Sequence, residues 1–307
     1  MPPEEPLMLV GAFTWTEFAQ QLAAGIREGA IYAGLALAIV IIYRSTRVIN
    51  FAQGELATFT TFIAWSLMNH GLSFWTAFPI VLAIAFTGGV AIERLVIRPV
   101  EHAPVLTIVI ITLGLALLLN GLMSVIWGGA SRQFNGPFST RTIDVGSVPI
   151  SVQDIGIVVV SVGLVVLLAL FFRFTKLGLA LRAAAVNPES SRLVGIRVGW
   201  MLALGWGIAA VLGAVAGMMI APVVFLDPNM MQTILLYAFA AAVLGGLDSP
   251  LGAVVGGILL GVTITLLGRY VGFIGSTLKL PAALMLILVL LLVRPGGLFG
   301  RVVVKRV

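Results

Sequence analysis

The stretch FTKLGLALRAAAVNPESSRLVGIRVGW, from Phe174 to Trp200, decides how this chain is laid out, because it interrupts long apolar runs with a segment too charged for lipid. Its positive charge comes from four residues: Lys176, Arg182, Arg192 and Arg197. Apolar residues nevertheless recur within it at helical spacing: Leu177, Leu181, Ala184 and Ala185. The pattern predicts a short helix at the membrane surface that docks on another molecule.

The composition of the chain excludes a soluble protein. Hydrophobic residues make up 60% of the 307 residues and charged residues only 10%, whereas about a quarter of a soluble domain is charged. We therefore expect a polytopic membrane protein surrounded by lipid. The formal net charge of +6 is explained by arginines kept at cytoplasmic helix ends, so we expect no nucleic-acid partner. Because there is no cysteine, disulfides and thiolate metal sites are excluded.

Nine apolar runs approach the ~20 residues that an α-helix needs to cross ~30 Å of hydrocarbon. They are 18–43, 52–69, 75–93, 104–127, 154–174, 200–221, 229–247, 250–268 and 278–293. The sequence predicts an all-α polytopic membrane protein with about 8–9 transmembrane helices, built as a single transmembrane domain over residues 1–307. The charges of Arg27 and Glu28 place the first third of 18–43 in the interface or against another helix.

The distribution of Lys and Arg between these runs predicts the orientation. With the N-terminus outside, thirteen basic residues fall in cytoplasmic loops: Arg44, Arg47, Arg94, Arg98, Arg173, Lys176, Arg182, Arg192, Arg197, Arg294, Arg301, Lys305 and Arg306. Four fall outside: Arg132, Arg141, Arg269 and Lys279. We therefore expect the N-terminus outside and the C-terminus inside, with the coupling loop 175–199 in the cytoplasm. The loop 128–153 is then extracytoplasmic and forms a small cap.

Three places interrupt the helical pattern near membrane depth, where non-helical backbone is tolerated only inside protein or along a wet cavity. In the first, from Arg47 to Glu55, polar side chains gather at Asn50, Gln53 and Glu55. One interpretation is a short re-entrant hairpin that lines a translocation route. The other is an ordinary cytoplasmic turn, with Asn50 as a helix cap and Glu55 in the first turn of the next helix. The spacing leaves both open.

The other two interruptions contain residues typical of turns. In 245–252 we expect Asp248 or Ser249 to cap a helix that Pro250 begins, and the glycines to allow close helix packing. The segment 221–229, with its Pro and Asn residues, is predicted to be an outside turn.

Catalytic and metal-binding patterns are missing from the sequence. His70 and His102 stand alone in predicted loops, without a second ligand at a metal-binding spacing. There is no G-x-S-x-G nucleophile elbow, and none of the lysines belongs to a Walker A loop. We therefore expect a chain that is not an enzyme and holds no metal or cofactor, so that any ATP it depends on is bound by another chain.

Four ordered motifs form a further pattern. The first is Ile49-Asn50-Phe51-Ala52-Gln53-Gly54-Glu55; the second is Gly178-x-Ala180-x-Arg182-Ala183-x-Ala185-x-Asn187 followed by Leu193-x-Gly195-Ile196. The third is the glycine-rich run from Gly245-Gly246 through Gly257, and the fourth is Arg294-Pro295-Gly296-Gly297-Leu298-Phe299-Gly300. Together they resemble the branched-chain amino acid ABC transporter permeases of the LivH/LivM type, from about Phe18 to Gly300, and the first motif favours the LivH-like subunit.

The resemblance implies a permease subunit of an ATP-binding cassette importer in the bacterial inner membrane, conducting amino acids, with branched-chain ones first. Its implied partners are two ATPase subunits that carry ATP and Mg, a second LivM-like permease and an extracytoplasmic substrate-binding protein. The residues implied to couple to the ATPases are Gly178, Ala180, Arg182, Ala183, Ala185, Asn187, Gly195 and Ile196. The small residues would nest in an ATPase groove, and Arg182 would meet an acidic or carbonyl partner there.

Conduction of a zwitterion needs polar groups along the pathway without a deep charge that traps it. The candidates are Asn50, Gln53, Glu55, Thr58, Thr61 and Asn120. Glu55 also has a structural interpretation, as a favourable charge at a helix start. The alternatives are an ABC permease for urea, amides or sugars, and a stand-alone secondary transporter, which needs ionisable groups deep in its spans.

Overall fold

The computed structural model describes residues 14–145, 148–275 and 277–300. Each of the nine predicted apolar runs is a helix. They are α1 (Trp15–Thr46), α2 (Gln53–Asn69), α3 (Phe74–Ile92), α4 (Val105–Trp127), α5 (Val152–Phe174), α8 (Val198–Val224), α9 (Met230–Gly245), α10 (Pro250–Tyr270) and α11 (Lys279–Val293). Two shorter helices, α6 (Lys176–Val186) and α7 (Pro188–Leu193), lie in the predicted coupling loop. The prediction of a helical polytopic membrane protein is confirmed.

The helices differ in length. Within the described residues, six are long and apolar enough to cross a membrane, namely α1, α3 with its extension to Val100, α4, α5, α8 and α10. The other three, α2, α9 and α11, have 17, 16 and 15 residues. At ~1.5 Å per residue each is shorter than about 26 Å, less than the ~30 Å of a hydrocarbon core. The predicted 8–9 spans are therefore six full-length helices and three short ones.

Helix α3 ends irregularly. It continues as a π-helical turn, η1 (Glu93–Ile97), and then as a 3-10 turn, η2 (Arg98–Val100). A π turn carries one extra residue and so changes the direction in which the following side chains point. In η1 the guanidinium of Arg94 lies over the ring of Trp200, 3.5 Å from its centroid, which fixes this extension against the start of α8.

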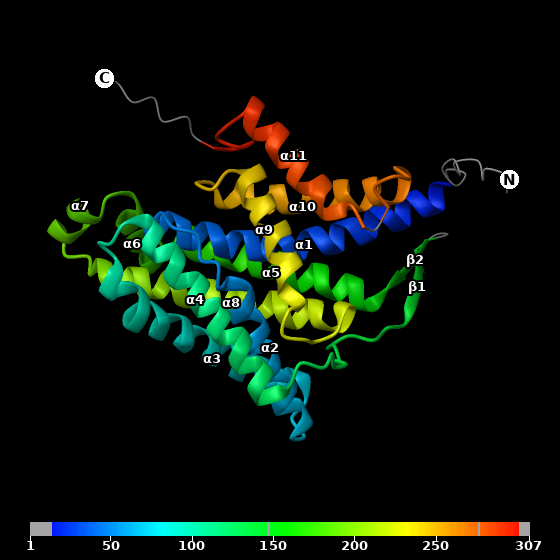
Figure 1. Cartoon of the computed structure of the whole chain (residues 1–307), viewed down its shortest axis with the longest axis horizontal. Coiled ribbons are helices and arrows are strands. Elements are labelled where there is room, and N and C mark those ends of the chain that lie inside the picture. Colours follow the sequence, from blue (N-terminus) through cyan, green and yellow to red (C-terminus); the bar gives the residue numbers. More distant parts are fainter. Residues whose placement is uncertain (1–13, 146–147, 276, 301–307) are drawn as a thin grey trace, which may run out of the picture.

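Helices α1 and α8 form the centre of the bundle. Both are buried along most of their length, whereas only a small part of α3, α4 and α5 is buried. Figure 1 shows α1 crossing the middle of the molecule, with α10 and α11 on one side of it and α3 and α4 on the other. The exposed apolar surface of the outer helices is the part that lipid would cover.

Helices α1 and α10 pack closely through glycines. A Cβ atom at Gly257 would lie 2.5 Å from the backbone of Ala33, and one at Gly261 would lie 2.4 Å from the backbone of Gly29. Only glycine fits at such distances, as in the small-xxx-small contacts of membrane helices. The predicted helix cap at the start of α10 is present as well. Ser249 directly precedes Pro250, and its hydroxyl accepts a hydrogen bond of 3.0 Å from the amide of Gly252.

The loops sort into two ends of the bundle. At one end, which we call the hairpin end, strands β1 (Thr142–Val145) and β2 (Val148–Ser151) pair antiparallel. Beside them Arg132 and Leu226 exchange backbone hydrogen bonds of 2.8 and 2.9 Å. The predicted cap at 128–153 is thus a small β-hairpin, which an all-helical prediction does not contain.

The opposite end, which we call the α6 end, holds the turn 47–52, the helices α6 and α7, and the turn 246–249. The predicted orientation places these same loops together on one side of the membrane. The structure also brings them together at one end of the bundle. Which end faces the cytoplasm stays a prediction. Three of the basic residues counted for it, Arg301, Lys305 and Arg306, lie outside the described residues.

Candidate functional site

The predicted coupling segment folds as two capped helices. Thr175 precedes α6, and its hydroxyl accepts a hydrogen bond of 2.9 Å from the amide of Gly178. Asn187 ends α6 and begins α7, where its side-chain oxygen accepts a hydrogen bond of 3.0 Å from the amide of Ser190. Pro188 occupies the first position of α7, where its missing N–H costs nothing. The sequence therefore holds this segment in one shape through local hydrogen bonds.

Two of the predicted coupling residues are glycines with structural reasons to be glycine. A Cβ atom at Gly178 would lie 2.3 Å from the carbonyl oxygen of Phe171, so the start of α6 packs directly on the end of α5. Gly195 has φ of +83°, a left-handed conformation that closes the turn after α7. Ala180, Ala183, Ala185 and Ile196 are half-buried, and Arg182 is exposed.

One face of α6 packs against the rest of this chain. Gly178, Leu181 and Ala184 are buried, and they pack the helix against α5 and α8. Large apolar side chains are exposed elsewhere on α6 and α7 and directly after α7: Leu177, Leu179, Val186, Leu193 and Val194. The sequence predicts that Leu177, Leu181, Ala184 and Ala185 form the apolar face that docks on another molecule. In the structure Leu181 and Ala184 are instead buried within this chain, and the exposed Leu179 and Val186 were not predicted. The sequence does indicate these exposed positions, because Leu179, Val186 and Val194 do not follow the helical spacing of the buried residues Gly178, Leu181 and Ala184.

The four motifs, far apart in sequence, meet at the α6 end. The Arg47 guanidinium lies 2.7 Å from the carboxylate of Asp248 and so joins the first turn to the glycine-rich turn. The amide of Leu298 donates a hydrogen bond of 2.8 Å to the carbonyl of Leu244, which brings in the last motif. Arg182 lines a small cavity together with residues of α1, α5 and α10, which brings in the coupling segment.

The first two pathway candidates, Asn50 and Gln53, are buried and turned inward. The Asn50 side-chain oxygen accepts a hydrogen bond of 3.0 Å from the amide of Ala52, and its amide nitrogen lies 3.4 Å from the Gln53 oxygen. The Gln53 amide donates a hydrogen bond of 2.8 Å to the carbonyl of Ala209 in α8. The helix cap of α2 is Ala52 rather than Asn50, and the Asn50 side chain instead stabilises the turn before it.

The remaining pathway candidates are divided between two places. Thr58 and Thr61 are buried in α2 and donate hydrogen bonds to the carbonyls of Gly54 and Ala57. Asn120, in contrast, lies near the hairpin end, where its amide donates to the carbonyl of Pro228. The structure therefore brings five candidates together along α2 and places Asn120 apart from them.

Glu55 differs from its neighbours on α2. The residue is 8% exposed, and none of the ion pairs within the described residues includes it. It lies in the first turn of α2, where the unpaired helix amides favour a negative charge.

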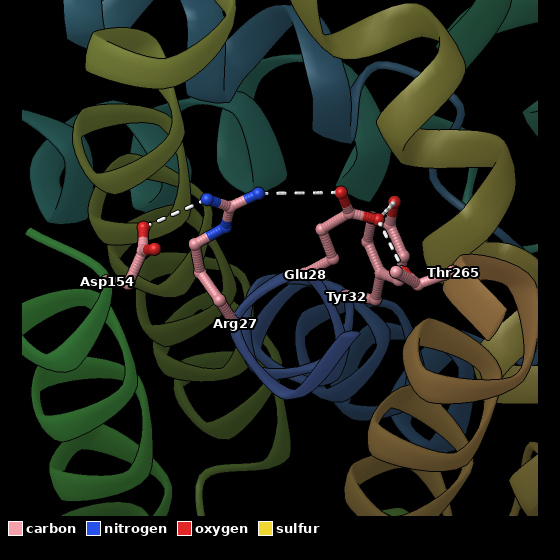
Figure 2. A network of polar contacts seen from close by, with 5 residues as sticks. All are labelled: Arg27, Glu28, Tyr32, Asp154 and Thr265. Atoms are coloured by element: carbon pink, nitrogen blue, oxygen red, sulfur yellow. Dashed lines mark hydrogen bonds and ion pairs between the residues drawn. The ribbon is translucent and has the colours of Figure 1, made fainter. Parts of the chain in front are cut away.

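A second polar cluster lies toward the hairpin end (Figure 2). The Arg27 guanidinium donates a hydrogen bond of 2.9 Å to Asp154 and lies 3.6 Å from Glu28. The other Glu28 oxygen accepts hydrogen bonds from the hydroxyls of Tyr32 and Thr265, at 3.4 and 3.3 Å. The cluster ties α1 to α5 and α10, so the charges predicted in the first third of α1 lie against other helices. No group of three or more potential metal ligands occurs in the described parts of the chain.

Comparison with known proteins agrees with the four motifs. The model of the family described as "Branched-chain amino acid transport system / permease component" matches residues 21–293. The high-affinity branched-chain amino acid transport system permease protein LivH of Salmonella typhimurium is 30% identical over 306 residues, covering 94% of this chain and 98% of that protein.

Two further relatives show the breadth of the similarity. The high-affinity branched-chain amino acid transport system permease protein BraD of Pseudomonas aeruginosa is 31% identical, covering 94% of this chain and 98% of that protein. The fructose import permease protein FruF of Bifidobacterium longum is 26% identical, covering 85% and 70%. Because the family model and the relatives span nearly the whole sequence, this chain belongs to the family of permease components of branched-chain amino acid transport systems.

Proposed function

We propose that this chain is the membrane-spanning permease subunit of an ATP-binding cassette importer and that it conducts amino acids, with branched-chain amino acids as the first candidates. The observation that carries the proposal is the pair α6 and α7, a rigidly capped segment that exposes Leu193 and Val194 at 89% and 76%. Apolar side chains so exposed outside the spanning helices are suited to an interface with another protein.

The proposed partners are two ATPase subunits, a second LivM-like permease and an extracytoplasmic substrate-binding protein. ATP and Mg belong to the ATPase subunits, and this chain holds no cofactor and performs no catalysis. The location is the bacterial inner membrane, with the α6 end in the cytoplasm and the hairpin end outside. This orientation puts the basic residues of 175–199 on the cytoplasmic side.

The packing supplies a path by which an ATPase could move the transmembrane helices. Force on α6 is transmitted to α5 through the direct contact at Gly178 and to α8 through the packing of α6 on that helix. Helix α8 in turn packs along α2. We propose that this connection lets closure of the ATPases alter the polar surface of α2.

Within the pathway we assign the leading role to Glu55. Asn50, Gln53, Thr58 and Thr61 already satisfy hydrogen bonds within the protein. Glu55 alone among the candidates on α2 has a carboxylate, and because it lies in the first turn of that helix it can attract the ammonium group of an amino acid without placing a charge deep in the membrane. Asn120 is retained as a candidate near the outer mouth.

The cargo has one supported alternative. The fructose import permease of Bifidobacterium longum shares 26% identity with this chain, so a sugar is the second candidate, followed by urea and amides. A stand-alone secondary transporter is disfavoured because the charges of α1 are joined in ion pairs to Asp154 and Glu28 rather than held alone at the bilayer centre.

The test is co-purification of the tagged chain in mild detergent. We expect an ATP-hydrolysing subunit to accompany the wild-type chain and to be lost from a Leu193→Asp, Val194→Asp double variant. Phe273→Asp is the matched control, because Phe273 is 79% exposed but lies between α10 and α11, away from α7. A stable chain that never carries an ATPase would overturn the proposal. The cargo is decided by a comparison of leucine uptake with fructose uptake by the reconstituted complex.

A further inference from the structure

Helices α3 and α8 pack backbone against side chain with almost no space between them. A Cβ atom at Gly89 in α3 would lie 2.6 Å from the carbonyl oxygen of Trp206 in α8. One at Gly207 in α8 would lie 2.8 Å from the ring of Phe86 in α3. Small residues at such a contact let two membrane helices approach closely and hold them in one relative position.

Arg94 continues this contact to the first turn of α8. It belongs to the π turn η1 that extends α3, and its guanidinium lies 3.5 Å from the centroid of the Trp200 ring. A cation over the face of a Trp ring is the strongest form of this attraction, and the attraction grows when the cation is withdrawn from water. The Nε atom of Arg94 is buried. The pair therefore joins the end of α3 to the start of α8.

Arg98 makes a second contact between the same two elements. Its guanidinium occupies the space that a side chain at Gly199 in α8 would fill. The carboxylate of Glu93, in the same π turn, lies 3.6 Å from this guanidinium, and the Glu93 side chain is only 2% exposed. Because the carboxylate is withdrawn from solvent, its attraction for Arg98 is weakly screened. Glu93 therefore holds Arg98 in place against α8.

Helix α5, in contrast, is separated from α3 and α8 by an apolar groove of about 290 Å³. The groove is lined on one side by α5 and on the other by α3 and α8, with the residues Leu164, Leu167, Leu168, Phe171, Phe86, Ile208, Val211 and Leu212. Side chains that interdigitate leave few spaces larger than a water molecule. Helix α5 also packs on α8 less extensively than α3 does. The bundle is therefore tight between α3 and α8 and loose between these helices and α5.

The predicted coupling segment reaches both sides of this groove. On one side Gly178 of α6 packs on the carbonyl of Phe171, a residue of α5 that lines the groove. On the other side Trp200 lines a surface hollow of about 460 Å³ with three of the predicted coupling residues, Ala180, Gly195 and Ile196. A displacement of the segment therefore acts on α5 at Gly178 and on the joined helices α3 and α8 at Trp200.

We infer that α3 and α8 move as one body against α5 when the ATPases displace the coupling segment, and that Arg94 is the positioning residue that joins this body to the segment through Trp200. Shifts of whole helices along an interface are a common form of such transitions. Helix α2 packs on both α3 and α8, so this movement carries the pathway candidates of α2 with it. The inference rests on the proposed function, because the ATPases supply the displacement.

The first test measures the leucine transported per ATP hydrolysed by the co-purified complex in proteoliposomes. Arg94→Gln should keep the ATPase bound and active but lower this ratio about fivefold, the factor that a cation–π contact contributes to an equilibrium. Arg94 is not among the described residues that line the hollow, so the docking surface stays unaltered. Arg173→Gln is the matched control and should leave the ratio unchanged. Its guanidinium lies over the Phe174 ring at 5.4 Å, but both residues belong to α5, so their contact joins no two helices.

A second set of variants tests the contact from the other side. Trp200→Leu removes the ring and should lower the ratio as Arg94→Gln does, whereas Trp200→Phe keeps a ring and should retain most of it. The double variant Arg94→Gln, Trp200→Leu should be no worse than either single variant, because all three lose the same contact. Additive losses would show that the two residues act separately and would overturn the role of the pair. If Arg94→Gln fails to fold, the two Trp200 variants decide the matter.

The movement itself is measured with pairs of spin labels, since the chain has no cysteine of its own. Labels at Ile84→Cys in α3 and Val159→Cys in α5, both exposed, should change their distance when ATP is added to the complex. Labels at Ile84→Cys and Val223→Cys in α8 lie within one body and should keep theirs. A complex that transports leucine with no change between α3 and α5 would overturn this inference alone. A chain without any ATPase would overturn the proposed function and the inference together.

Discussion

Arg27 and Asp154 meet across 2.9 Å, and their contact joins the N-terminal half of α1 to the first turn of α5. The two side chains are 18% and 26% exposed, so the pair is largely withdrawn from solvent. In that setting the attraction between the charges is only weakly screened. The contact therefore acts as a clamp between the central helix and an outer helix.

Asp154→Asn should loosen this clamp. Removing one partner from a buried ion pair costs ~3–5 kcal/mol, and we expect about 2 kcal/mol here because Glu28 still lies near Arg27. The measurement is the melting temperature of the purified chain in detergent. Asp248→Asn is the control, because its pair with Arg47 is exposed and should contribute less than about 1 kcal/mol. Equal effects of the two variants would contradict the clamp.

Gly261→Ala should separate α1 from α10. The added methyl would meet the Gly29 backbone at 2.4 Å, and backbone atoms cannot rotate away, so we expect a loss of about 1–3 kcal/mol. Gly121→Ala is the matched control, because a methyl there meets no atom within 4 Å and alanine favours a helix by up to ~1 kcal/mol. Thermal unfolding of the two variants in parallel checks the prediction, which is contradicted if Gly261→Ala melts at or above the wild-type temperature.

Gln53→Leu and Glu55→Gln should distinguish a residue that stabilises the fold from one that takes part in transport. The leucine removes the bond to Ala209 and leaves the Asn50 amide without its acceptor, so we expect stability to fall by about 1–3 kcal/mol with uptake per folded molecule preserved. The glutamine should preserve the melting temperature and lower leucine uptake by proteoliposomes. The reverse pattern would move the pathway assignment from Glu55 to Gln53.

Asn187→Ala should weaken the start of α7. The lost cap costs ~1 kcal/mol locally, so α7 should fray and the associated ATPase should dissociate at lower salt. Asn187→Asp keeps an oxygen that accepts the Ser190 amide and should restore retention of the ATPase. If both variants retain the ATPase as the wild type does, the shape of α7 does not matter for docking.

Much of the helical framework could be predicted from the sequence because each apolar run is long and its period is local. Ser249 and Pro250 marked the start of α10 correctly, since capping depends only on neighbouring residues. The π turn at Glu93–Ile97 could not be predicted, because its extra residue is stabilised by contacts such as Arg94 with Trp200, far away in the chain.

The local structure of the predicted coupling segment could be anticipated from the sequence, but the contacts of the pathway candidates could not. The basic loop was identified from its charges, and Gly178 and Asn187 have the local roles that their residue types indicate. Whether a polar side chain such as Gln53 faces a pathway or the inside of the bundle depends on how α2 and α8 come together. Sequence spacing along one helix does not contain that information.

The amides of Leu298 and Phe299 bond to the carbonyls of Leu244 and Gly245, at 2.8 and 3.1 Å. During synthesis those carbonyls lack these hydrogen-bond donors until α10 and α11 have been made and inserted. The end of α9 is therefore completed late, after the helices that follow it in the chain. Assembly of this face of the protein is thus a post-insertion event, and a ribosome-stalled chain that stops within α11 would expose an unfinished surface to quality-control proteases.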